Sequence, residues 1–153
     1  MHGFVSTYTM KLDAKGRVSV PAPFRQILAA DGFEGLYCFP APDMAALDAG
    51  GNRLLSTIEA RLEGLQPYSE AHDLLSTAFY GVSEILKIDQ DGRVGLTETL
   101  KAYAGISGQV TFVGQAYKFQ IWAPERFADY LAEARAKARA VLRGGAPAGS
   151  AQA

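Results

Sequence analysis

The sequence predicts an α+β fold made of two copies of one unit. Residues 13–18 recur at 89–94, and with the same offset residues 11–25 align with residues 87–101. Five of the fifteen aligned positions are identical. Each copy also has the same local pattern of strand, turn, second strand and short helix. An internal repeat of this kind indicates that one structural unit is used twice.

The repeated turn carries an aspartate at its first position and a glycine at its fourth. Asp13 and Asp89 can accept hydrogen bonds from nearby backbone N–H groups, while Gly16 and Gly92 tolerate a positive φ. Strand-like residues lie on both sides of each turn, at 9–12 and 17–20 in the first copy and at 83–88 and 93–96 in the second. Each copy is therefore predicted to form a short β-hairpin.

A helix is predicted after each hairpin, followed by more strands. Residues 22–30 form the first of these helices. Thr97 is the expected N-cap of the matching helix, which ends near Gly105 because glycine accepts the left-handed conformation of a helix C-cap. Further strands are predicted at 36–39, 109–113 and 118–122.

More helices are predicted between the copies and at the end of the chain. Apolar side chains within residues 54–65 fall on one helical face, and Ser69 can cap a helix that runs to residue 79. A last helix starts at Pro124 and runs to about residue 142. The expected parts are the first repeat with its following helix (5–66), the linking helix and second repeat with the C-terminal helix (67–143), and a disordered tail rich in Ala and Gly (144–153).

Composition and charge exclude several classes of protein. Fifteen Lys and Arg residues stand against sixteen Asp and Glu, a net charge of −1. This balance excludes a uniformly basic nucleic-acid coat protein, although residues 1–25 carry four basic residues and one acidic residue. No apolar run reaches the roughly 20 residues that span a bilayer, and the start of the chain lacks a secretory signal pattern. A cytoplasmic location without a membrane partner is expected.

The residue types offer little support for catalysis or metal binding. Cys38 is the only cysteine, and His2 and His72 are the only histidines, which is too few for a Cys- or His-based metal cluster. Nucleophilic catalysis needs a Ser or Cys beside a base, and His72 lies in a polar stretch where an exposed or capping role is more common. The glycines form no nucleotide-binding loop. We expect no enzyme activity, no catalytic residue, no cofactor and no metal.

The first turn is the strongest candidate for a binding site. Lys15 and Arg17 flank Gly16 at the expected hairpin tip, and Arg25 lies near the start of the following helix. A lysine can contact phosphates, and an arginine can contact phosphate or the edge of a guanine, so these residues fit DNA. The alternative is a tight turn with solvated charges, or an Asp–Arg pair that only holds the loop.

The second turn carries different charges. Asp89, Gly92 and Arg93 repeat the first pattern, but Asp91 stands where the first turn has Lys15, and its charge would repel a phosphate. The second turn is therefore expected to be mainly structural, with at most a weak DNA contact. Arg135, Arg139 and Arg143 form a further basic stripe. Most stripes of this kind are solvated faces of helices rather than nucleic-acid contacts.

Other segments accompany the two turns. They are Ser6-Thr7-Tyr8-Thr9, Ser19-Val20-Pro21-Ala22-Pro23-Phe24-Arg25, Tyr103-Ala104-Gly105-Ile106, Val113-Gly114-Gln115 and Lys118-Phe119-Gln120-Ile121-Trp122. Together with both turns, they resemble the MraZ family over residues 4–142. This family consists of AbrB/MazE-like transcriptional regulators with two SpoVT-AbrB-type repeats.

The resemblance implies a bacterial regulator of its own division and cell-wall gene cluster, associated with the nucleoid. It implies a pseudo-twofold, swapped-hairpin-like β-barrel made of two AbrB-like repeats, with helices packed outside. Subunits are expected to form a ring of about eight that contacts direct repeats of double-stranded promoter DNA. The DNA contacts of the family correspond to Lys15 and Arg17, with Asp13 and Gly16 shaping the loop.

Departures from the family pattern occur in the second copy. Thr97 stands where that copy often has proline, and Lys101 where arginine is usual, which weakens the second copy as a DNA reader. An antitoxin-like module that neutralises a toxin partner is an alternative with the same fold. Such modules usually carry one AbrB-like copy and a partner-binding tail, so two fused copies and a short tail argue against it.

Overall fold

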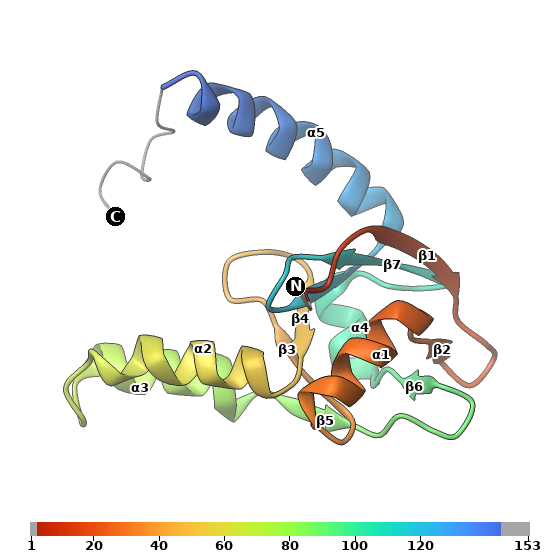
Figure 1. The fold of residues 1–153 in the computed structure, drawn as a ribbon, viewed down its shortest axis with the longest axis horizontal. Coiled ribbons are helices and arrows are strands. Elements are labelled where there is room, and N and C mark those ends of the chain that lie inside the picture. The colour runs from red at the N-terminus through yellow and green to blue at the C-terminus, as the bar shows by residue number, and fades with distance from the viewer. Residues whose placement is uncertain (1–2, 145–153) are drawn as a thin grey trace.

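The computed structural model describes residues 3–144, and Figure 1 shows its ribbon. Helices and antiparallel strands share the chain, which confirms the predicted α+β class. Nearly all of the tail that was expected to be disordered lies outside the described residues. No helix within residues 3–144 is long and apolar enough to cross a membrane.

The two repeats contain the same elements in the same order. The first has β1 (Thr7–Lys11), β2 (Arg17–Ser19), α1 (Ala22–Asp31), β3 (Leu36–Pro40) and β4 (Leu47–Gly50). The second has β5 (Glu84–Leu86), β6 (Arg93–Gly95), α4 (Glu98–Ala104), β7 (Gln109–Gly114) and β8 (Phe119–Trp122). Between them lie α2 (Asn52–Glu63), α3 (Glu70–Ser76) and the π-helical turn η1 (Thr77–Gly81), and α5 (Pro124–Leu142) follows the second repeat.

The predicted helix caps are present. The hydroxyl of Ser69 accepts a hydrogen bond from the N–H of His72 at the start of α3, and Thr97 accepts one from the N–H of Leu100 at the start of α4. Gly105 ends α4 in the left-handed conformation, with a φ of 67°. Local sequence signals were sufficient here because each cap involves residues only a few positions apart.

The strands beside each turn pair across the repeats. β1 pairs with β7, β5 pairs with β3, and β2 pairs with β6, all antiparallel. The prediction of two local hairpins is therefore wrong: each turn forms, but its flanking strands find their partners in the other repeat. Alternating apolar and polar residues specify which face of a strand is buried, but they do not specify which strand completes its hydrogen bonds.

Six strands form one sheet in the order β1-β7-β8-β4-β3-β5, while β2 and β6 form a separate two-stranded ribbon. The order is symmetric about the central pair β4–β8, because matching strands of the two repeats occupy matching positions. These pairings do not by themselves close the sheet, so the swapped-hairpin-like barrel stays a prediction.

The main core orients the two-stranded ribbon. Phe24 of α1 is fully buried, with ring centroids 5.2 Å from Phe4 and 4.8 Å from Phe119. Val18 of β2 and Val94 of β6 are each 1% exposed and belong to the same core. Because burying a side chain of this kind contributes roughly 1.5–3 kcal/mol, the valines hold one face of the ribbon against the core. The other face is left for polar side chains.

A buried polar network joins β4 to β8. Asp48, 5% exposed, accepts hydrogen bonds from the Lys118 ammonium (2.9 Å) and from the Gln120 amide (3.1 Å). The Gln120 carbonyl oxygen in turn accepts from the indole N–H of Trp122 at 2.9 Å. Residues 118, 120 and 122 share one face of the strand, while Phe119 and Ile121 face the main core. The alternation in the segment 118–122 therefore places polar side chains in the buried network on one face of β8 and apolar side chains in the main core on the other.

Two helical parts project from this body. Leu54, Ile58 and Leu62 of α2 pack on Tyr37 and Phe39 of β3 in a second, smaller core. In Figure 1, α2 and α3 extend to the left, and α5 extends over the top of the molecule in the same direction. The loops between β1 and β2 and between β5 and β6 lie at the opposite end.

Candidate nucleic-acid interface

The first turn is held together by the carboxylate of Asp13. Its Oδ1 accepts hydrogen bonds from the backbone N–H groups of Lys15 and Arg17, both at 2.9 Å. Its Oδ2 accepts from Nε of Arg17 at 2.7 Å. Gly16 has a φ of 77° and donates its N–H to the Asp13 carbonyl oxygen at 3.0 Å. These hydrogen bonds and the positive φ of Gly16 define the shape of the loop.

The second turn repeats this geometry and adds one contact. Asp89 accepts from the backbone N–H groups of Asp91 and Arg93 at 2.9 Å and from Nε of Arg93 at 3.1 Å, and Gly92 has a φ of 79°. In addition, Nη2 of Arg93 donates to the Asp91 carboxylate at 3.2 Å. Within residues 3–144, Arg17 makes no such second contact, so its terminal amino groups are free to bind a ligand.

The ribbon register places both arginines on one face. The paired residues are Arg17↔Gly95, Val18↔Val94 and Ser19↔Arg93. Directly opposite residues of an antiparallel pair point to the same side, and side chains alternate along each strand. Arg17 and Arg93 therefore both lie on the outer face. Arg93 is two residues from Gly95, the partner of Arg17, so the two arginines are about 7 Å apart along the ribbon. The inner face carries the buried valines.

Backbone hydrogen bonds attach each turn to the other repeat. The carbonyl oxygen of Gly16 accepts from the N–H of Leu96 at 3.1 Å, and that of Gly92 accepts from the N–H of Val20 at 2.9 Å. Each turn glycine is therefore held by a residue far away in the sequence, which helps to order the loop before any ligand binds.

Long basic side chains also cross between the repeats. A Cβ added to Gly92 would lie 1.6 Å from Nη1 of Arg25, so the Arg25 guanidinium lies against the second turn. A Cβ added to Gly16 would lie 3.4 Å from Nζ of Lys101, which forms an ion pair of 2.9 Å with Glu98. The sequence grouped Arg25 with the first turn and overlooked Lys101 there. Arg25 and Lys101 occupy aligned positions in the two copies, which indicates that they have equivalent places in the fold. Which turn each side chain reaches could be inferred only once the strands were known to pair across the repeats.

The two turns consequently differ in charge. We define the first-turn cluster as Lys15, Arg17 and Lys101 with Asp13 and Glu98, which has one basic residue in excess. We define the second-turn cluster as Arg25 and Arg93 with Asp89 and Asp91, in which the charges balance. An anion is therefore attracted more strongly to the first-turn cluster.

The turn carboxylates are held in the charged form. The backbone N–H of Arg17 is the main cause that lowers the pKa of Asp13 below its ordinary value, and the backbone N–H of Arg93 acts in the same way on the pKa of Asp89. Partial burial opposes this effect in both turns. The Arg17 side chain is 34% exposed and that of Arg93 is 31% exposed, so both arginines are partly buried. Lys15, in contrast, is exposed.

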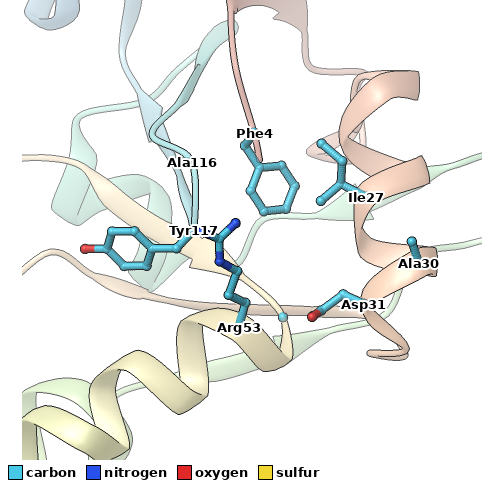
Figure 2. Close-up of a pocket in the computed structure, with 8 residues that line it drawn as sticks. Phe4, Ile27, Ala30, Asp31, Arg53, Ala116 and Tyr117 are labelled. Atoms are coloured by element: carbon cyan, nitrogen blue, oxygen red, sulfur yellow. The ribbon is translucent and has the colours of Figure 1, made fainter. Parts of the chain in front are cut away.

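Outside the two turns, the described residues offer no metal-binding cluster. Among residues 3–144, no group of three or more His, Cys, Asp or Glu side chains could hold a metal ion. Cys38 is fully buried, and that burial raises the pKa of its thiol. A pocket of about 430 Å³ lies between α1, α2 and the β7–β8 connection, and Figure 2 shows the side chains that line it. Its one carboxylate, Asp31, accepts the backbone N–H of Asn52 and so caps α2.

Comparison with known proteins identifies related chains. The family model described as "MraZ protein, putative antitoxin-like" matches residues 79–143. A "Transcriptional regulator MraZ" of Methylocella silvestris is 62% identical over 94% of this chain and 87% of its own length. Proteins of the same name from Xanthobacter autotrophicus (60% identical, over 91% of this chain and 88% of its own length) and Rhizobium meliloti (41% identical, over 88% and 92%) also match.

Proposed function

Because the chain belongs to the MraZ family, we propose that it is a transcriptional regulator that reads DNA through its first turn. The relatives are named as transcriptional regulators and not as enzymes, in line with the residue types of this chain. The observation that carries the proposal is the state of Arg17. Its Nε is anchored on Asp13, while its two terminal amino groups remain free within the described residues.

The ribbon of β2 and β6 supports contact in the major groove, which admits a two-stranded β-ribbon. Arg17, on the outer face, can donate two hydrogen bonds to O6 and N7 of a guanine, a contact worth about 1–3 kcal/mol of discrimination. Lys15 is exposed beside it and suits a phosphate. Because the turn is already ordered, little conformational entropy is lost when DNA binds.

The second turn is proposed to have a mainly structural role. Two carboxylates hold Arg93, so a base contact would first require breaking its hydrogen bond with Asp91. Arg25, lying against Gly92, is the side chain of this cluster without an ion pair among residues 3–144. We therefore assign Arg25 a phosphate contact beside the second turn, and assign Asp89, Gly92 and Arg93 to holding that turn.

The target and the assembly are further parts of the proposal, supported by the family resemblance. We propose that the protein acts in the cytoplasm, associated with the nucleoid, on direct repeats upstream of its own division and cell-wall gene cluster. One subunit offers few phosphate contacts, whereas tight DNA binding usually needs several. A ring of about eight subunits repeats the contact and supplies avidity without a high net charge.

The test is a footprint over the upstream region of the protein's own gene, followed by anisotropy titrations with the protected duplex and a scrambled duplex. We expect protection at regularly spaced repeats and a clear preference for the protected sequence. Equal affinity for both duplexes at all salt concentrations would contradict sequence-specific regulation.

The matching family model is also described as putative antitoxin-like, and the same protein preparation tests that alternative. A toxin partner would copurify in fixed proportion as a small basic protein and would block or alter DNA binding. Purification of the chain alone, with full DNA binding, would argue against this role.

A further inference from the structure

The outer half of α5 is an unpartnered helical surface. The inner half is attached to the body, where Tyr130 stacks on Trp122 with ring centroids 4.8 Å apart. Beyond Ala134, every residue of the helix is exposed, including Val141 at 50% and Leu142 at 86%. Ala134, Ala138, Val141 and Leu142 follow the spacing that aligns side chains on one helical face. This face is apolar, and its alanines allow another helix to approach closely.

The same half of α5 is strongly basic. Residues 134–143 contain four basic residues and no acidic one. Lys137 pairs with Glu133 of the preceding turn, but within residues 3–144 no acidic side chain pairs with Arg135, Arg139 or Arg143. These three arginines follow one another at every fourth position and therefore run beside the apolar face.

A groove of opposite charge lies between α2 and α3. Its volume is about 490 Å³, and Leu62, Leu65, Pro67 and Tyr80 supply apolar walls. Glu59 and Glu63 of α2 line the same groove, and both are exposed. Residues 59–73, which run along it, contain four acidic residues and one basic residue. The groove therefore complements the outer half of α5 in both polarity and charge.

We propose that the outer half of α5 of one subunit docks into the α2–α3 groove of a second copy of this chain. Within one subunit both surfaces are exposed, so neither fills the other. Each copy carries both surfaces at different places, which makes the contact head-to-tail. A contact of this kind propagates from copy to copy and forms a ring when the rotation closes. The inference rests on the oligomer of the proposed function and names the surfaces that build it.

Two other occupants fit the observations less well. The basic end of α5 points away from the end of the molecule that carries both turns, so it does not extend the same DNA-binding face (Figure 1). Antiparallel pairing of two α5 helices would set the basic half against the half with Glu125, Asp129 and Glu133. That half already uses its aromatic side chains against Trp122 of its own subunit.

Charge reversal on each surface tests the docking. One full-length variant carries Arg135→Glu with Arg139→Glu, and a second carries Glu59→Lys with Glu63→Lys. Light scattering coupled to gel filtration should show that each variant alone falls from the wild-type mass to that of one subunit. An equimolar mixture should recover the wild-type mass, because each α5 then meets a groove of opposite charge. The combined four-fold variant should also assemble.

Matched controls separate this from general effects of charge. Ala136→Glu with Ala140→Glu adds acidic residues to the opposite face of α5 and should leave the mass unchanged. Circular dichroism checks folding, and the single changes Arg139→Glu and Glu63→Lys repeat the mixing test if a double variant unfolds. Wild-type mass in either folded double variant, or a mixture that stays dissociated, would overturn the docking.

Two measurements separate docking between subunits from DNA reading by the turns. Scattering without DNA decides the docking alone. Binding of a duplex with a single repeat depends on the turns and should be within about twofold of wild type in both dissociated variants. Binding of a duplex with several repeats should fall at least tenfold, because avidity is lost.

Discussion

The two turns have nearly the same backbone and differ in what surrounds their arginine. In both, one aspartate accepts the same two backbone N–H groups and the Nε of the arginine. The first turn places Lys15 next to this frame, whereas the second places Asp91 there, and Asp91 holds Arg93. The comparison teaches that the DxxGR pattern encodes a scaffold. The neighbouring side chains decide whether the scaffold presents an arginine or retains it.

The largest expected effect is that of Arg17→Ala. The protein should lose its preference for operator DNA at moderate salt, because an arginine contact with a base contributes about 1–3 kcal/mol and the loss is repeated in every bound subunit. Anisotropy titrations with operator and scrambled duplexes measure this. Since Arg17 also binds Asp13, thermal unfolding must show that the variant is folded.

Arg17→Lys is the matched control for charge. It keeps the positive charge but lacks the planar fork that binds a guanine edge. We expect it to retain binding to scrambled DNA and to lose the preference for the operator. Full operator preference in Arg17→Lys would show that Arg17 contributes charge rather than base recognition.

A smaller effect is expected for Lys15→Ala. A phosphate contact is insensitive to sequence, so affinity for operator and scrambled duplexes should fall by a similar factor. The slope of log affinity against log salt should decrease by about one for each bound subunit. Asp91→Lys should act in the opposite direction at the second turn. A change confined to the operator would show that Lys15 reads bases.

Substitution of the two turn glycines should affect the stability of the fold. Both have positive φ, so Gly16→Ala and Gly92→Ala should each destabilise the fold by about 1–2 kcal/mol. Only Gly92→Ala also displaces Arg25, because its Cβ would occupy the position of that guanidinium. Its melting temperature should therefore fall at least as far as that of Gly16→Ala, with a small difference because the Arg25 guanidinium is the end of a flexible side chain. A larger loss for Gly16→Ala would contradict the position of Arg25.

The smallest effect concerns acid stability, in which the turns should behave alike. Asp13 and Asp89 both have a pKa below the ordinary 3.8, so their stabilisation is complete above that value and is lost as the pH falls through the lower folded pKa. Thermal unfolding of Asp13→Asn and Asp89→Asn should therefore approach wild type below about pH 4. A constant difference from wild type down to pH 2 would contradict this.

Local features of the fold could be predicted from the sequence. The caps at Ser69 and Thr97, the two turns and the end of α4 at Gly105 depend on residues close together in the chain, and all were found where expected. The partner of each strand could not be predicted, because β1 pairs with β7 about a hundred residues away. Alternation of side chains is the same for either partner.

In the candidate site, too, local contacts could be predicted from the sequence and contacts between the repeats could not. Asp13, Gly16 and Arg17 form one local motif, so their contacts followed from spacing alone. Arg25 and Lys101 reach turns of the other repeat, and their placement depends on strand exchange. The contact between Arg93 and Asp91 was also missed, since the sequence indicated only that Asp91 would repel phosphate.

The most direct test of the difference between the turns compares Arg17→Ala with Arg93→Ala in one titration series against operator DNA. Affinity is expressed per folded oligomer, with folding checked by thermal unfolding and mass by light scattering. We predict that Arg93→Ala lowers the melting temperature or the mass. Its normalised operator affinity should stay within about threefold of wild type, which is a smaller loss than the 1–3 kcal/mol of a base contact. Arg17→Ala should lose operator preference. Equal loss of affinity in two well-folded variants would contradict the assignment of reading to the first turn.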